Sequence, residues 1–230
     1  MDSVAKIYDN MEVNSDDTMS LFLSSFSEKK DIEIVSIFSA WMMHGWKEEE
    51  SEIFDFVRNT FLPTPTSYIT EYPHSSFYKS SNFSLFKILT LPYLDNFLKR
   101  LHDVILKYGD LESAFFCAQK KRDVFAHETL ARLFCGNTGF QSKHTNGTFY
   151  RYNLFLYWMT YKLKIWHLLI KNALLPCDDF VFQKAYELGI TNKVLKSNLP
   201  QTIALTEKAK KMFGEQNFYK LYEIIKYKKE

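Results

Sequence analysis

The sequence predicts an all-α protein, and three observations support that fold class. Gly and Pro are scarce, at 7 and 6 of 230 residues, so the chain contains few obligatory turns. Apolar residues recur at helical spacing in most segments, and no alternating strand pattern of useful length occurs. Hydrophobic residues make up 46% of the composition, which is enough to build a substantial core.

The first helices are expected before a pair of prolines. One or two short helices are predicted in the polar segment 1–30, which contains the apolar patch 19–26. Residues 31–46 carry apolar side chains at helical spacing, with Gly45 near the end, and predict a strong helix. Residues 48–61 predict a further helix that stops before Pro63, because a residue preceding proline disfavours the helical conformation.

The clearest amphipathic helix is expected in the middle of the chain, after a long loop. Residues 64–82 are rich in Ser, Thr, Pro and Tyr and predict that loop, with one short helix in it. Residues 92–108 carry a continuous apolar stripe, and Gly109 ends the helix. Shorter helices are predicted over 111–120 and 124–134.

The last part of the chain begins with a turn-rich connection over 136–148, which holds three of the seven glycines. Five helices are then predicted, over 150–166, 168–175, 178–188, 199–213 and 217–226. The expected architecture is two helical lobes within one compact unit spanning 1–230. The loops 62–82 and 136–148 are the candidate lobe boundaries.

The charge is unevenly distributed along a chain whose net charge is only +2. Residues 1–60 hold thirteen acidic and five basic side chains, and residues 190–230 hold four acidic and nine basic ones. This distribution suits a protein with one electropositive face that meets a polyanion. Ordinary solvated helix faces explain it equally well.

Cysteine and histidine usage predicts no metal and no cofactor. Cys117, Cys135 and Cys177 are odd in number and widely spaced, so they form no disulfide framework, no zinc pair and no iron–sulfur ligand set. The six histidines are scattered, with no pair at ligand spacing on one helix. The first residues lack the features of a signal peptide, and no apolar run reaches the roughly 18 residues of a membrane span. We therefore expect a cytoplasmic protein with no membrane partner.

Three blocks of sequence carry a family resemblance. The first contains D-I-E-I at 31–34, and the second spans 98–111. The third is R-Y-N-L-F-L-Y-W-M at 151–159, followed by L-P-C-D-D-F-V at 175–181. In this order they resemble a bacterial domain-of-unknown-function family, whose members carry a D-I-E-I block, a K-R-x-N-x-x-L-R-W-M block and a P-L-D-T-H-V block. The resemblance covers residues 25–228.

That family looks like a distant branch of the helix-hairpin-helix base-excision DNA glycosylases, the endonuclease III-like superfamily. The resemblance implies a two-lobed all-α fold that binds double-stranded DNA through a hairpin. It also implies a catalytic aspartate in the third block, where Asp178 is the matching residue. The stretch matching the hairpin is 144–150, whose backbone N–H groups would bind phosphate. The candidate DNA-binding residues are Lys143, Asn146, Gly147, Thr148, Tyr150 and Arg151.

Each of these assignments has a simpler structural explanation. A glycosylase needs a carboxylate near the sugar, because positive charge develops there as the base leaves. Asp178 suits that role, but it also suits an N-cap of the helix that follows Pro176. Likewise, Asn146 and Gly147 form a common turn pair, so a plain surface turn explains them as well.

The chain departs from the superfamily pattern at several positions. Tyr150 stands where bifunctional glycosylases carry a nucleophilic lysine, and the guanidinium of Arg151 stays protonated and cannot replace it. Asp179 and Phe180 replace the Thr and His of the family block, and Tyr157 replaces its Arg. Three functions remain open: a monofunctional DNA glycosylase, a catalytically inactive DNA-binding module of the same fold, and a helical protein-interaction scaffold.

Overall fold

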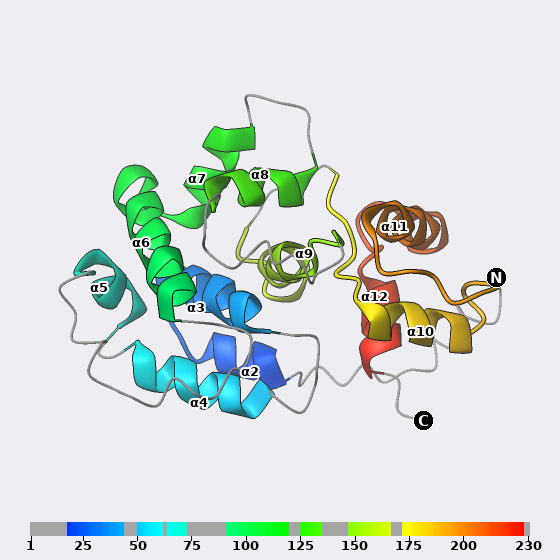
Figure 1. Cartoon of the computed structure of the whole chain (residues 1–230), viewed down its shortest axis with the longest axis horizontal. Helices are drawn as coiled ribbons and strands as arrows, with labels where there is room; N and C mark the ends of the chain where they lie inside the picture. The colour runs from blue at the N-terminus through cyan, green and yellow to red at the C-terminus, as the bar shows by residue number, and fades with distance from the viewer. Residues whose placement is uncertain are drawn as a thin grey trace. The chain divides into compact units, whose positions relative to one another are not determined.

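A computed structural model describes residues 18–43, 50–61, 64–72, 91–119, 125–134, 147–166 and 172–227. Within these ranges all the regular secondary structure is helical and no strand occurs, which confirms the predicted all-α class. The described residues divide into two compact units (Figure 1). We call residues 18–134 the N-terminal unit and residues 147–227 the C-terminal unit.

The N-terminal unit is built around one central helix, α3. Its helices are α2 (Thr18–Ser24), α3 (Lys29–Met42), α4 (Glu50–Thr60), α5 (Pro65–Thr70), α6 (Leu91–Tyr108), α7 (Leu111–Gln119) and α8 (Ala126–Leu133). α3 is buried from Glu33 to Met42 and packs against α2, α4, α5 and α7. The ring of Trp41 stacks on Phe97 of α6, with centroids 5.0 Å apart. The strong helical pattern predicted over 31–46 therefore marks the core of this unit.

The two acids of the D-I-E-I block lie on α3 and cap other helices. Asp31 accepts hydrogen bonds from the backbone N–H and the hydroxyl of Thr66, at 2.8 and 2.6 Å, in the first turn of α5. Glu33 accepts from the backbone N–H groups of Leu111 and Glu112, at 2.9 and 3.3 Å, at the start of α7. Each carboxylate satisfies N–H groups that a helix leaves without partners and opposes the helix dipole. The block thus holds three helices together.

The C-terminal unit contains α9 (Tyr150–Tyr157), the π-helix η5 (Trp158–Lys162), α10 (Asp179–Glu187), α11 (Leu199–Phe213) and α12 (Lys220–Tyr227). α10 and α11 both pack against α12 (Figure 1). The single helix predicted over 150–166 widens into η5, where Leu163 N–H donates to the carbonyl of Trp158 at 2.9 Å. Trp158 and Trp166 are buried core residues, as the sequence predicts.

The helix predicted over 168–175 is wrong for the residues that the structure describes. From Asn172, a turn residue, to Asp178 the chain is not helical, and residues 167–171 lie outside the described ranges. Pro176 disfavours a helical conformation at Leu175. The backbone N–H of Leu175 instead donates to the hydroxyl of Thr206 on α11, at 3.0 Å. The apolar run Ala173–Leu175 is buried without forming a helix.

Candidate functional site

Asp178 lies at the N-terminus of α10, where the sequence places it. Its backbone is extended, with φ −124° and ψ −174°, and its carboxylate accepts a 2.8 Å hydrogen bond from the N–H of Val181. It is therefore the N-cap of the helix, which confirms the structural explanation of this residue. Capping uses one carboxylate oxygen in this bond and leaves a catalytic role open.

The segment before Asp178 is held rigidly against α11. The hydroxyl of Thr206 accepts from Leu175 N–H and donates to the carbonyl of Thr202, at 3.0 and 2.8 Å. The thiol of Cys177 is buried and has a hydrogen bond with Thr202. Burial raises the pKa of that thiol well above its usual value, so Cys177 is protonated and is not a nucleophile at neutral pH. Asp178 follows this segment directly and caps α10.

The environment of Asp178 raises the pKa of its carboxyl to about 6. Burial is the main cause, because it disfavours the charged form, and the neighbouring charge of Asp179 adds to it. The N–H of Val181 and the ammonium of Lys226 act in the opposite direction. A carboxyl group with a pKa near 6 is mostly ionised at neutral pH and still accepts a proton readily. That balance is suited to general acid–base work.

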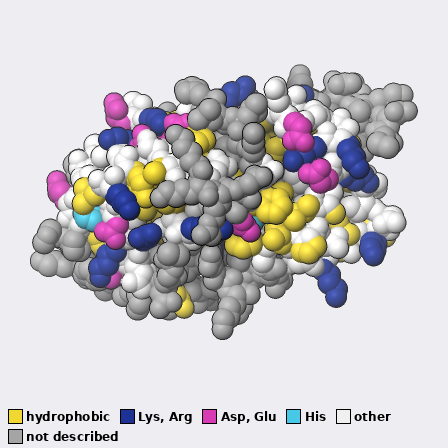
Figure 2. All heavy atoms as spheres, turned by 90° about the horizontal axis from the view of Figure 1, so that it is seen from above, with side chains coloured by type: hydrophobic (Ala, Val, Ile, Leu, Met, Phe, Trp, Pro, Cys, Tyr) yellow, Lys and Arg dark blue, Asp and Glu magenta, His cyan; other side chains and the backbone are white. Residues whose placement is uncertain are grey.

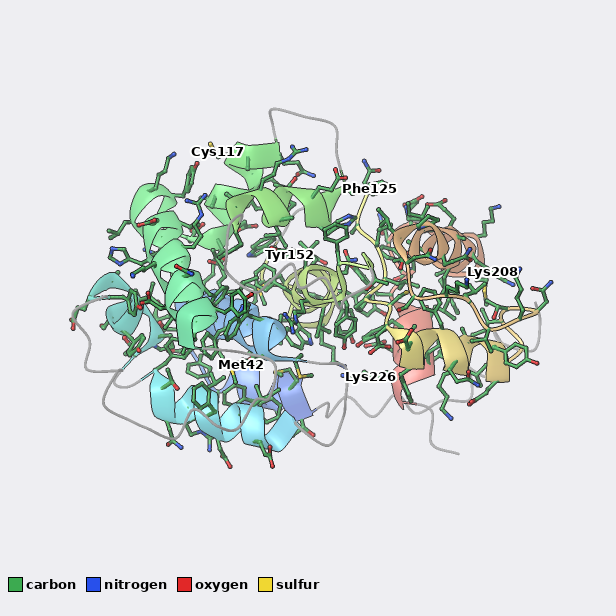
Figure 3. The ribbon with its side chains drawn as sticks, viewed as in Figure 1. Met42, Cys117, Phe125, Tyr152, Lys208 and Lys226 are labelled. Atoms are coloured by element: carbon green, nitrogen blue, oxygen red, sulfur yellow. The ribbon has the colours of Figure 1, made fainter. Side chains whose placement is uncertain are left out.

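Lys226 extends from α12, the helix packed against α10 (Figure 3). Its positive charge lowers the pKa of Asp178 against the effect of burial. We expect Lys226→Gln to raise the pKa of Asp178 above about 6, measured by carbon NMR titration of the aspartate carboxyls. Lys184→Gln is the matched control, because Lys184 lies in the last turn of α10 and pairs with Glu187 at 2.9 Å. An unchanged Asp178 titration in Lys226→Gln would show that the two charges do not interact.

A second polar cluster fixes the helix that carries Lys226. The carboxylate of Glu223, which is 5% exposed, accepts from the hydroxyl of Tyr157 at 3.2 Å and from the ammonium of Lys162 at 3.4 Å. Tyr161 also donates to it, at 3.5 Å. Glu223 and Lys226 are three residues apart and share one face of α12. The cluster ties α12 to η5 and so sets the position of Lys226.

Sequence reasoning missed this cluster, although one signal was present. Glu223 and Lys226 are charged residues within the apolar stretch 221–227, and a buried charge requires partners. The sequence does not show that the partners lie on residues 157–162. π-helical turns are frequent at functional sites, and η5 supplies two of the three groups that contact Glu223, while Tyr157, the last residue of α9, supplies the third.

The predicted DNA-binding residues are only partly placed by the structure. Lys143 and Asn146 lie outside the described residues. Gly147 is exposed, with φ +76°, in the left-handed region that favours glycine. The side chains predicted to bind DNA at the next positions are buried: the exposed fractions of Thr148, Tyr150 and Arg151 are 2%, 6% and 4%. Their contact with DNA remains a prediction, and of the four described positions Gly147 alone is exposed.

The start of α9 has no side-chain cap. Phe149 precedes the helix with φ 54°, and the side-chain amide of Asn153 donates to the carbonyl of Thr148 at 3.1 Å. Burial lowers the pKa of Arg151 to about 10, so its guanidinium still carries its charge at neutral pH. Tyr150, the first residue of α9, contributes a buried phenol and no amine. The described part of this segment therefore provides no Schiff-base nucleophile.

Two further findings apply to the described residues alone. No three His, Cys, Asp or Glu side chains among them come together in a group that could hold a metal ion. None of their helices combines the length and the apolar character that crossing a membrane requires.

Comparison with known proteins gives one match. The family described as "Protein of unknown function (DUF2400)" matches residues 20–216, which include all three sequence blocks and Asp178. No curated protein matches the chain, and no solved structure matches it.

Proposed function

We propose that this chain, which belongs to the DUF2400 family of proteins of unknown function, binds double-stranded DNA and acts as a monofunctional DNA glycosylase on a damaged base. Asp178 is the catalytic carboxylate in this proposal. The observation that carries it is the combination at this residue of helix capping, a pKa of about 6 and the nearby charge of Lys226. The resemblance to helix-hairpin-helix glycosylases, in which an aspartate of the same block is catalytic, supports the same residue.

The proposed reaction is hydrolysis of the bond between the base and C1′ of its sugar. The base leaves with the bonding electron pair, and positive charge develops on the sugar, which an ionised Asp178 stabilises. Water then adds to C1′ and gives one proton to the carboxylate, which a group of pKa about 6 accepts and passes through solvent to the departed base. The target nucleotide must leave the base stack to reach such a carboxylate. The absence of an amine at Tyr150 favours hydrolysis over lyase chemistry.

The division of charge between the two units supports DNA as the partner. The described residues of the C-terminal unit contain eleven Lys and Arg against six Asp and Glu, a net charge of +5. Those of the N-terminal unit contain seven against twelve, a net charge of −5. A polyanion is attracted to the unit that carries Asp178.

A specific observation also favours a second candidate, a DNA-binding module without catalysis. Asp179 follows Asp178 and raises its pKa, whereas the family block has a threonine there. A second acid beside the carboxylate repels nearby phosphate. This candidate predicts the same DNA binding with no base release.

The test is a panel of short duplexes, each with one damaged or unusual base, assayed for free base and for binding at several salt concentrations. Base release together with salt-sensitive binding supports the glycosylase. Salt-sensitive binding without release on any duplex overturns it in favour of the inactive module. If no duplex binds at low salt, the DNA partner is wrong, and a helical scaffold for a protein partner takes its place.

A further inference from the structure

Most acidic side chains of the C-terminal unit are already engaged by lysines of the same unit. Figure 2 shows one face of the molecule, on which blue Lys and Arg side chains are scattered and often stand beside magenta acidic ones. On α11, Lys210 pairs with Glu207 at 3.1 Å and with Glu215 at 3.4 Å. On α10, Lys184 pairs with Glu187. Each of these groups of side chains is neutral or negative, so the net charge of +5 comes from other residues of the C-terminal unit.

Besides Lys164 and Lys208, three further lysines of this unit are exposed and have no carboxylate within 4.0 Å in the described part of the chain. They are Lys193 and Lys196, in the loop that joins α10 to α11, and Lys211, in the last turn of α11. We call these three residues the lysine surface. Since no acid of the described chain lies within 4.0 Å of them, they carry part of the excess positive charge of the unit at its surface.

The loop that carries Lys193 and Lys196 is held in place. Lys208 of α11, which is labelled in Figure 3, donates a hydrogen bond to the carbonyl of Ile190 at the start of the loop. The hydroxyl of Thr191 donates to the carbonyl of Lys193 at 2.9 Å. Lys208 and Lys211 are three residues apart and share one face of α11, so the loop is attached to the face that carries Lys211. The three lysines therefore belong to one ordered region.

The position of this region relative to Asp178 suits a bound duplex. Asp178 caps the N-terminus of α10, and the loop leaves its C-terminus after Leu188. A helix of nine residues is about 13 Å long, at about 1.5 Å per residue. Successive base pairs rise by about 3.4 Å, so the loop begins about four base pairs away from the carboxylate. Phosphates flanking a nucleotide at Asp178 fall within that range.

We infer that the lysine surface contacts backbone phosphates of double-stranded DNA on one side of the nucleotide that Asp178 addresses. This inference rests on the proposed function and extends it, because it assigns a DNA contact that the hairpin resemblance does not include. The three ammonium groups provide position and affinity, and they carry no base recognition. The expected signature is a contribution to the salt dependence of binding.

The test compares the wild type with a variant carrying Lys193→Gln, Lys196→Gln and Lys211→Gln. Binding to a fluorescent duplex is measured as a function of salt. Each phosphate contact contributes roughly 0.9 to the slope of log affinity against log salt, so we expect the slope to fall by about 2 to 3. The matched control removes three exposed charges of the N-terminal unit, with Lys30→Gln, Lys107→Gln and Arg132→Gln. We expect the control to keep the wild-type slope.

The outcomes separate this inference from the proposed function. If the wild type binds no duplex at low salt, the proposed function fails and the inference fails with it. If the wild type binds with a steep slope that the lysine variant retains, DNA binds elsewhere and only the inference is overturned. An equal fall in the lysine variant and in the control overturns it too, because the effect is then one of net charge. If the lysine variant loses the same salt slope on single-stranded DNA as on the duplex, the partner of the lysine surface is a single strand, and the duplex contact is overturned.

Discussion

Asp178→Asn is expected to reduce base release by about 100-fold to 10,000-fold, the range that a positioned acid–base group contributes. Asparagine caps a helix as well as aspartate does, so the hydrogen bond from Val181 and the start of α10 are kept. The amide neither stabilises a positive sugar nor takes a proton from water. Duplex binding is expected to remain, because the lysine surface is untouched. The measurement is single-turnover release of base from saturating duplex.

The same substitution is expected to stabilise the protein at neutral pH. The folded-state pKa of Asp178, about 6, lies above the ordinary value of 3.8. Between these two values the folded protein binds the proton more tightly than the unfolded chain does. The raised pKa of Asp178 therefore contributes its full stabilisation below about pH 4, and this contribution is lost as the pH rises through about 6. The shift corresponds to an upper limit of about 3 kcal/mol, which Asp178→Asn recovers at pH 7 and above.

Because the pKa of His127 is also shifted, the wild type and Asp178→Asn must be compared at each pH. Burial lowers the pKa of this histidine to about 4, so its contribution is present above pH 6.5 and is lost as the pH falls through about 4. Over the same range the contribution of His127 to stability rises with pH while that of Asp178 falls. The pH dependence of the wild type by itself therefore does not reveal the contribution of Asp178. The difference in free energy of unfolding between wild type and Asp178→Asn removes the contribution of His127. A difference that stays flat from pH 4 to 7 would contradict the raised pKa and weaken the case for an activated carboxylate.

Local patterns made most of the helices predictable. The helix predicted over 199–213 has those bounds in the structure, because Asn198 caps it, Pro200 lies in its first turn and Gly214 follows it with φ +82°. Asp178 was predictable for the same reason, as a capping residue after Pro176. Capping chemistry and apolar periodicity depend on residues a few positions apart, and the sequence shows these directly.

Features that join distant residues could not be predicted in this way. The carboxylate of Glu223 accepts hydrogen bonds from residues about sixty positions earlier, and no nearby sequence pattern identifies those partners. The apolar run Ala173–Leu175 has the composition of a buried helix, but the backbone N–H of Leu175 bonds to the hydroxyl of Thr206 instead. The family match spans all of the blocks, but the role of the D-I-E-I block became visible only through the hydrogen bonds of α3.

Glu33→Ala is expected to destabilise the protein by about 3 kcal/mol without changing the chemistry at Asp178. Its carboxylate is 0% exposed, and its removal leaves the N–H groups of Leu111 and Glu112 without this acceptor at the start of α7. It also removes one of the acids around Lys29, whose ammonium lies 3.8 Å from Glu33 and bonds to Glu112. The expected measurement is a lower urea midpoint at pH 7.

Glu33→Ala and the wild type are then compared by their rates of base release per folded molecule, measured well below the melting temperature. Glu33 belongs to the N-terminal unit, and Asp178 belongs to the C-terminal unit. If the block acts only by capping, Glu33→Ala keeps the wild-type rate once the unfolded fraction is subtracted. Leu111→Ala, which removes a buried side chain at the same helix start and keeps both backbone donors, controls for destabilisation alone. A loss of base release in Glu33→Ala, but not in Leu111→Ala at equal stability, would place the acidic block in the reaction itself.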